Sequence, residues 1–164
     1  MALKIELLQK SHNRSNFDSN TPLLDNYIRS QSSQDVKRNL SACYVLVVDD
    51  LVLGYYTLSG NSIPRKEMPQ AQVQKLPGSY HDLPTILLGR LAVDKSMQGK
   101  GYGAVLLSNA LERCVQLAEQ LGTLAIVVDP IDEKARRFYA KFGFILIPGN
   151  GKMFIPIATV RKWK

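Results

Sequence analysis

The strongest constraint on the fold is an apolar strand that runs into a glycine-rich turn and then into a long helix. Thr85–Val93 (TILLGRLAV) is the most apolar stretch, and Gln98–Gly103 reads QGKGYG. Apolar residues then recur near the 3.6-residue period, which predicts a helix from about Gly101 to Gln120, closed by Gly122. Successive glycines let backbone N–H groups converge, and a helix N-terminus adds positive potential. The unit therefore predicts an anion site suited to a pyrophosphate, with a plain tight connection as the alternative.

The rest of the chain alternates between short strand and helix patterns. We expect strands at Leu3–Leu8, Ala42–Val48, Leu51–Ser59, Leu124–Val128, Phe144–Ile147 and Met153–Ala158. We expect a helix from Pro22, capped by Thr21 and broken at Ser30–Ser33, and another over Asp132–Phe142, ended by Gly143. Four prolines between Ile63 and Pro84 argue against a long helix or a central strand there. This order predicts an α/β fold with a mixed sheet in one domain, residues 1–164.

Composition excludes several classes of protein. The sequence contains no run of about 18 apolar residues, the length that a membrane span needs. The charged residues in Met1–Lys10 are wrong for a signal peptide. Cys43 and Cys114 are too few for a disulfide framework, so we expect a reducing compartment, the cytoplasm. A chain of 164 residues can bury a core of its own, so we expect no metal.

The net charge of +7 is placed unevenly along the chain. Residues 1–82 hold nine basic and eight acidic side chains, whereas residues 83–164 hold twelve and six. A basic half is compatible with a merely soluble surface, and it also suits a polyanionic partner such as nucleic acid. Charge alone therefore leaves both interpretations open.

Two common phosphate-binding motifs do not fit the glycine turn. The nucleoside triphosphate loop needs Gly-Lys before Ser or Thr, and here Gly101 follows Lys100. The dinucleotide fingerprint needs the spacing G-x-G-x-x-G, which Gly99, Gly101 and Gly103 do not have. Both motifs are excluded.

The pattern that does fit is Gln/Arg-x-x-Gly-x-Gly/Ala, preceded by RLAVD at Arg90–Asp94. It resembles the acetyl-CoA motif of the GNAT acetyltransferase superfamily, whose element order this chain shares. The resemblance implies the GNAT fold, a mixed sheet of six to seven strands with a splayed central strand and helices on both faces. The splay would leave backbone groups of Leu91 and Val93 free for the pantetheine amides, and the amides of Gln98–Ala104 would hold the pyrophosphate. The acetyl-CoA residues implied are Leu91, Ala92, Val93, Gln98, Gly99, Lys100, Gly101, Tyr102, Gly103, Ala104 and Asp132.

The second signature is the segment Asp132–Phe144, DEKARRFYAKFGF. It resembles the GNAT pattern Asn-x-x-Ala-x-x-Phe-Tyr, and Tyr139 falls where those enzymes place the tyrosine that protonates the CoA thiolate. A phenol with a pKa near 10 stays protonated at neutral pH, which suits a general acid. The alternative is a pair of ordinary core aromatics. Asp132 departs from the Asn that the pattern usually has at this position.

The central strand offers no general base. Thr85–Val93 contains no Asp, Glu or His, and we expect His12 and His81 to be isolated surface residues. Without a base, an α-amine with a pKa of 7.7–8.0 is easier to acetylate than a lysine ε-amine near 10.4. The cysteines lack a neighbouring His in sequence and are expected to be buried rather than nucleophilic.

Several further segments resemble the GNAT toxins of type II toxin–antitoxin pairs. They are Phe17–Ile28, Val52–Gly60, Gly89–Asp94 and Ala135–Phe144. This resemblance implies a toxin that blocks translation by acetylating the α-amine of aminoacyl-tRNA, with a ribbon-helix-helix antitoxin as partner and a homodimer as assembly. Candidate tRNA contacts are Lys37, Arg38, Arg90, Arg136, Arg137 and Lys141, each of which could also be an ordinary solvated charge.

Two alternatives remain open at this stage. A housekeeping GNAT that acetylates a small-molecule amine or a protein N-terminus would explain the CoA motif but not the charge asymmetry. A CoA-binding regulator without catalysis would not explain Tyr139.

Overall fold

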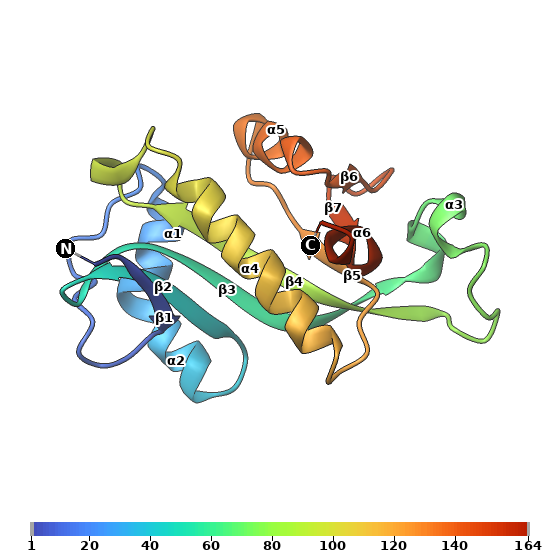
Figure 1. The fold of residues 1–164 in the computed structure, drawn as a ribbon, viewed down its shortest axis with the longest axis horizontal. Coiled ribbons are helices and arrows are strands. Elements are labelled where there is room, and N and C mark those ends of the chain that lie inside the picture. The colour runs from blue at the N-terminus through green and yellow to red at the C-terminus, as the bar shows by residue number, and fades with distance from the viewer. Residues whose placement is uncertain (1, 164) are drawn as a thin grey trace. The chain divides into compact units, whose positions relative to one another are not determined.

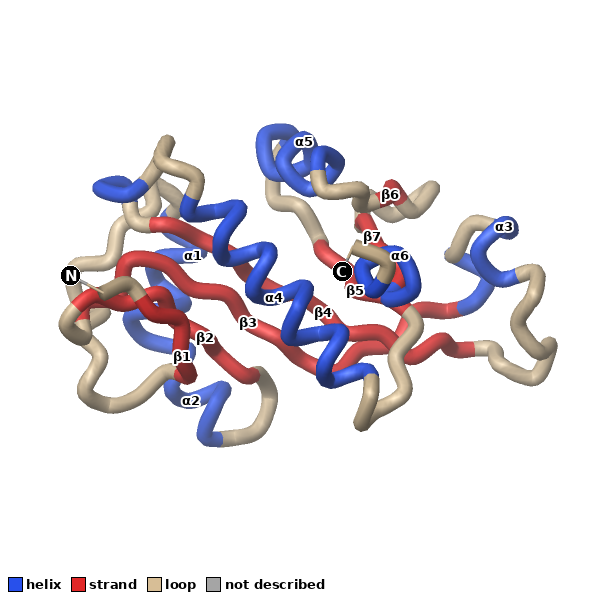
Figure 2. Tube along the Cα trace, viewed as in Figure 1, coloured by secondary structure: helices blue, strands red, loops and turns tan. Residues whose placement is uncertain are grey.

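The computed structural model describes residues 2–163 and contains one seven-stranded mixed sheet with the strand order β1-β2-β3-β4-β5-β7-β6 (Figures 1 and 2). Its strands are β1 (Lys4–Leu7), β2 (Ala42–Val48), β3 (Leu51–Pro64), β4 (Asp82–Val93), β5 (Ala125–Val128), β6 (Ile145–Leu146) and β7 (Met153–Pro156). Its α-helices are α1 (Pro22–Asn26), α2 (Ser32–Lys37), α3 (Gln70–Val73), α4 (Tyr102–Ala118), α5 (Glu133–Lys141) and α6 (Ile157–Arg161). None of the described helices combines the length and the apolar character that a bilayer crossing needs.

The chain forms two compact units. The first comprises the residues up to Ser59 together with Leu88–Ala110, and the second comprises Gly60–Leu87 together with the residues from Leu111 onward. The expected acetyl-CoA strand and glycine turn belong to the first unit. Tyr139 and its helix belong to the second.

In the first unit, helices cover both faces of the sheet. Consecutive side chains of β3 point to opposite faces, because a strand alternates with a period of two. Tyr55 donates its hydroxyl to the Leu24 carbonyl in α1, at 2.7 Å, whereas Tyr56 donates to Asn109 Oδ1 in α4, at 2.6 Å. The sheet is thus fixed to a helix on each side, as expected for this part of the fold.

The break expected at Ser30–Ser33 is a π-helical turn that begins earlier, at Tyr27. Tyr27–Gln31 forms this turn between α1 and α2. Arg14 reaches it from outside and donates to the Ile28 carbonyl at 3.1 Å and to Ser32 Oγ at 2.9 Å. A π-helical turn shifts the backbone hydrogen bonds by one residue, so an external donor is well placed to satisfy a carbonyl there.

The second unit has a core of its own between the β3–β4 connection and the C-terminal strands. Its buried residues are Ile63, Met68, Val73, Leu83, Ala125, Val127, Ile147 and Phe154. β5 is parallel to β4 and antiparallel to β7, so it lies between two partners in the sheet. All four of its residues are buried, which agrees with its apolar sequence AIVV.

Three sequence predictions about the elements were wrong. Pro84 lies inside β4, where it is tolerated because it precedes Thr85, the first residue that pairs with β5. The expected strand through Ala158 ends at Pro156 and gives way to α6, whose buried Ile157 and Val160 have helical spacing. Gly122 does not have the positive φ of a left-handed C-cap, whereas Gly143, after α5, has φ +98°.

His12 is not a surface residue, contrary to expectation. It is 5% exposed, and its Nδ1 accepts the Gln9 backbone N–H at 2.9 Å, which leaves Nε2 to donate to Glu6 Oε2 at 2.6 Å. A carboxylate oxygen of Asp50 lies within 4.8 Å of this pair, so the three side chains could offer ligand atoms to a metal ion. Since both ring nitrogens are already bonded, the histidine has a structural role here.

Candidate active site

The glycine turn has the geometry that an anion site requires. Gly99 and Gly101 have φ +76° and +86°, in the left-handed region that only glycine adopts freely. A Cβ built on either residue would meet no atom within 4 Å, so the turn faces open space. α4 begins at Tyr102, and its first amides have no partner inside the helix. The turn therefore presents backbone N–H groups and a helix N-terminus to solvent, which fits a pyrophosphate.

Gln98 holds this turn from inside. Its side-chain Nε2 donates to the Val93 carbonyl and to the Ser19 carbonyl, both at 2.9 Å. The sequence had suggested that the backbone groups of Val93 are free for a ligand. Its carbonyl is not free, because it already accepts this bond. What remains for a ligand at Val93 is its backbone N–H.

Asp94 fixes the start of the same turn. Its carboxylate accepts from the Ser96 backbone and hydroxyl, at 3.1 and 2.7 Å, and from the Asp18 backbone at 2.9 Å. Burial raises the pKa of Asp94, but these hydrogen bonds outweigh burial and hold it below the ordinary value. The carboxylate therefore stays ionised at neutral pH and keeps its three donors.

The C-terminal half of β4 continues beyond its pairing with β5. Within the described residues, this pairing comprises Thr85–Leu87 only. Leu91 is half-buried, and Ala92 and Val93 are buried. The amide and carbonyl of Leu91 thus have no β5 partner, which is what the expected splay of the central strand requires.

Tyr139 lies on the buried face of α5. It is 8% exposed, and its ring makes edge contacts with Phe138 and Phe144, with both centroid distances at 5.3 Å. Burial raises the pKa of its phenol above the ordinary value of 10. The hydroxyl is therefore fully protonated at neutral pH, as a proton donor must be.

Asp132 is the N-cap of α5. Its carboxylate accepts the Ala135 backbone N–H at 2.8 Å, in the manner of a helix-capping Asp. One carboxylate oxygen is thus committed to the helix.

The three candidate basic residues of α5 lie on two different faces. Arg136 precedes Tyr139 by three residues and shares its side of the helix, where it pairs with Glu133 at 3.3 Å. Arg137 and Lys141 are four residues apart, exposed, and on another face. Proximity to Tyr139 in the sequence therefore does not place all three charges beside its ring.

The remaining basic candidates lie in the first unit. Lys37 and Arg38 are exposed at the end of α2. The guanidinium of Arg90 is 3.6 Å from the centroid of the Tyr27 ring, in a cation–π contact. Arg90 thus has a structural partner, whereas Lys37 and Arg38 extend into solvent.

Comparison with known proteins decides the family. The sequence matches the Acetyltransferase (GNAT) family over residues 5–144. The chain belongs to this family. GNAT members use acetyl-CoA. The glycine turn suits its pyrophosphate, because Gly99 and Gly101 have positive φ angles and face open space.

The relatives of this GNAT acetyltransferase include toxins. It is 38% identical over 132 residues to a tRNA-acetylating toxin of Mycobacterium tuberculosis, covering 80% of this chain and 78% of the relative. It is 29% identical over 160 residues to a probable toxin TacT of Sinorhizobium fredii, covering 92% and 88%.

Solved structures of two toxins are similar to the whole acetyltransferase. A tyrosine-to-phenylalanine variant of KacT matches with a TM-score of 0.93 and 29% identity over 100% of both chains. AtaT in complex with acetyl-methionyl-tRNA matches with a TM-score of 0.91 and 28% identity, over 99% of both chains. A structure of AtaTR bound with acetyl-CoA matches with a TM-score of 0.86 and 30% identity, over 98% of this chain and 97% of that one.

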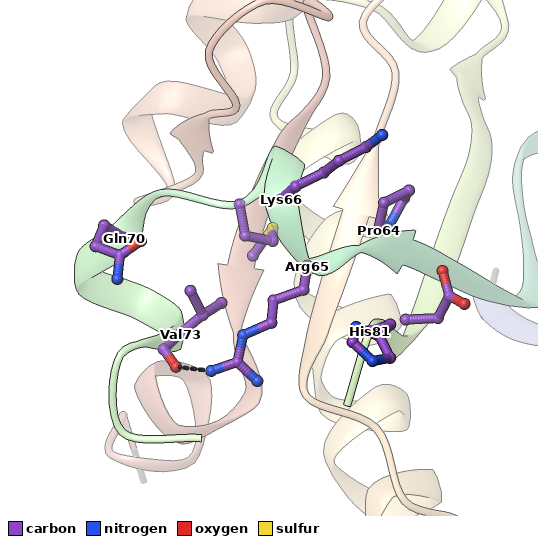
Figure 3. Close-up of a pocket in the computed structure, with 8 residues that line it drawn as sticks. Pro64, Arg65, Lys66, Gln70, Val73 and His81 are labelled. Atoms are coloured by element: carbon purple, nitrogen blue, oxygen red, sulfur yellow. Dashed lines mark hydrogen bonds between the residues drawn. The ribbon is translucent and has the colours of Figure 1, made fainter. Parts of the chain in front are cut away.

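A separate cavity of about 590 Å³ lies in the β3–β4 connection of the acetyltransferase (Figure 3). Its lining includes Lys66, Gln70 and His81, none of which is a predicted site residue. Arg65 braces the connection, because its guanidinium donates to the carbonyls of Val73, Leu76, Pro77 and Tyr80. The prolines predicted this irregular connection, and the hydrogen bonds of Arg65 stabilise it. No sequence motif indicated this arginine.

The cysteines of the acetyltransferase are expected to be inert towards thiol reagents. Cys43 and Cys114 are both fully buried, and burial raises the pKa of each thiol to about 12. Because the thiolate is the reactive form, iodoacetamide at pH 7.5 should leave the native protein unmodified and active. Intact-mass spectrometry measures this, with protein unfolded in guanidinium as the positive control. Rapid loss of activity with one added carbamidomethyl group would instead favour a cysteine nucleophile.

Proposed function

We propose that this acetyltransferase moves the acetyl group of acetyl-CoA to the α-amine of the amino acid on an aminoacyl-tRNA and so blocks translation. The observation that carries the proposal is the match over 99% of both chains to AtaT in complex with acetyl-methionyl-tRNA. The 38% identity to a tRNA-acetylating toxin supports it independently.

Each part of the candidate site has a role in this proposal. When bound, acetyl-CoA supplies an activated thioester. The amides of Gln98–Ala104 hold its pyrophosphate, and backbone groups of Leu91 hold the pantetheine arm. The acceptor amine attacks the thioester carbonyl, which the N–H of Val93 polarises. As the C–S bond breaks, Tyr139 donates its proton to the sulfur, and the proton that the amine loses restores the phenol. Asp132 caps its helix and so helps to fix Tyr139.

The absence of Asp, Glu and His from the Thr85–Val93 part of β4 fits an α-amine acceptor. Arg90 is the only ionisable residue between Thr85 and Val93. An α-amine with a pKa of 7.7–8.0 is substantially unprotonated near neutral pH, whereas a lysine ε-amine near 10.4 is not. The acceptor therefore supplies its own free amine.

We further propose that the chain acts as the toxin of a toxin–antitoxin pair in the cytoplasm. The structures of AtaT with the antitoxin AtaR support an antitoxin partner for this chain. By resemblance, that partner is a ribbon-helix-helix protein, and the toxin is a homodimer. The family match at residues 5–144 runs through both compact units, which supports one acetyltransferase domain over residues 1–164.

The proposal is tested by incubating the protein with acetyl-CoA and total charged tRNA. Mass spectrometry of the aminoacyl adenosine released by nuclease should show an added acetyl group. Transfer only to small amines or to protein N-termini would favour a housekeeping GNAT instead. Acetyl-CoA binding without transfer to any amine would favour a CoA-binding regulator.

The exposed basic face of α5 gives a second test. The double variant Arg137→Ala/Lys141→Ala is expected to raise the KM for charged tRNA about 3- to 10-fold, because two phosphate contacts are lost. The slope of log(kcat/KM) against log[salt] should become shallower by about 1 to 2. Lys10→Ala/Lys75→Ala removes the same charge from two other exposed positions and serves as the control. Equal effects of the two double variants would mean that only net charge matters.

A further inference from the structure

The irregular segment Phe17–Asn20 is bound to the acetyl-CoA turn by its backbone. Asp18 donates its N–H to Asp94 Oδ1 at 2.9 Å and accepts the Lys95 N–H at 2.8 Å. The side chains of Asp18 and Lys95 also form an ion pair at 3.2 Å. The carbonyl of Ser19 accepts from Gln98 Nε2. A loop some 75 residues away in sequence thus lies against the turn.

The side chain of Asp25 fixes Ser19 by two hydrogen bonds. Its Oδ1 accepts both the backbone N–H of Ser19, at 2.8 Å, and its hydroxyl, at 2.6 Å. Asp25 is 3% exposed and Ser19 is 7% exposed, so neither donor has water as a replacement partner. A buried carboxylate that accepts two hydrogen bonds from one residue fixes that residue firmly.

These contacts form one continuous chain. It runs from the Asp25 carboxylate to Ser19, from the Ser19 carbonyl to the Gln98 amide, and from that amide to the Val93 carbonyl. Gln98 directly precedes Gly99 and Gly101, the two residues with left-handed φ. The conformation of the turn therefore depends on where Ser19 is held.

We propose that Asp25 is a positioning residue for acetyl-CoA: through Ser19 and Gln98 it sets the backbone that receives the pyrophosphate. This inference rests on the proposed placement of the pyrophosphate at Gln98–Ala104. Asp25 itself touches no reacting atom.

The test compares Asp25→Ala with the wild type by titration with CoA. Asp25→Ala is expected to raise the Kd for CoA about tenfold, which corresponds to ~1.4 kcal/mol. Asp25→Asn keeps an acceptor oxygen for Ser19 and should recover most of the affinity. Gln98→Ala should weaken binding to a similar degree, and the double variant Asp25→Ala/Gln98→Ala should be no weaker than either single one, because both act in one chain.

A substrate without the pyrophosphate separates positioning from a general loss of structure. With S-acetylpantetheine as acetyl donor, kcat/KM in Asp25→Ala should stay within about twofold of the wild type, whereas with acetyl-CoA it falls about tenfold. Asn26→Ala, on the neighbouring exposed residue of α1, is the matched control and should change neither value.

The possible outcomes have distinct meanings. Equal losses with both donors, or no loss with either, would overturn the role of Asp25. Wild-type affinity for CoA in a variant that disrupts Gly101 would instead overturn the proposed pyrophosphate site. If Asp25→Ala does not fold, Asp25→Asn and Gln98→Ala decide the question by the same donor comparison.

Discussion

Replacement of Tyr139 by phenylalanine is expected to lower kcat for acetyl transfer by about 10²–10⁴-fold, the usual contribution of a general acid. The change removes one oxygen and keeps the ring, so the edge contacts with Phe138 and Phe144 persist. The Kd for acetyl-CoA should stay within about twofold of the wild type. Isothermal titration and a single-turnover assay with charged tRNA measure the two quantities separately.

The pH dependence of the same reaction follows from the direction of the Tyr139 pKa. Burial favours the neutral phenol and raises its pKa above 10. Tyr139 is therefore protonated throughout pH 6–9 and contributes no descending limb to the profile there. The rate should rise with pH towards the pKa of the acceptor amine and then level off.

Tyr80→Phe provides the control for this variant. Tyr80 is 55% exposed, and its change also removes a single hydroxyl. It should have wild-type kcat and should remain toxic when expressed, whereas Tyr139→Phe should be harmless. Unchanged turnover in Tyr139→Phe would remove Tyr139 from its role and leave protonation of the sulfur to water.

Local patterns in the sequence predicted most of the elements, including those that carry the expected site residues. The glycine turn, the helix after it, and the helix of Tyr139 each carry their own signal, because cap residues and 3.6-residue periodicity act within a few residues. The break near Ser30 was also visible as a loss of periodicity. By contrast, α6 was missed because a helix of five residues has too few apolar positions to establish a period.

Long-range contacts account for what the sequence could not show. The bond from Gln98 to Ser19 joins residues 79 apart, and that from Asp18 to Asp94 joins residues 76 apart. Nothing local distinguishes Asp25 from any acidic residue in a first helical turn. His12 was misjudged although its hydrogen-bond partners are close in sequence, Gln9 three residues and Glu6 six residues before it.

Replacement of Gly101 by valine is the second large effect that we expect. At φ +86° a β-branched residue is strained, and an L-residue there costs about 1–2 kcal/mol. The melting temperature should therefore fall by about 2–8 °C. The new side chain also enters the open space in front of the turn, where we place the pyrophosphate. The Kd for acetyl-CoA should rise at least 100-fold, or ~2.7 kcal/mol.

Gly78→Val separates the loss of binding from the loss of stability. Gly78 also faces open space, but its φ is not positive, and it lies outside the acetyl-CoA turn. Its variant should bind acetyl-CoA with wild-type affinity in a titration well below either melting temperature. Gly99→Val, at φ +76°, should instead resemble Gly101→Val. If Gly101→Val binds acetyl-CoA normally while Gly99→Val does not, then Gly99 alone shapes the anion site, and the amides that follow Gly101 at the start of α4 contribute little.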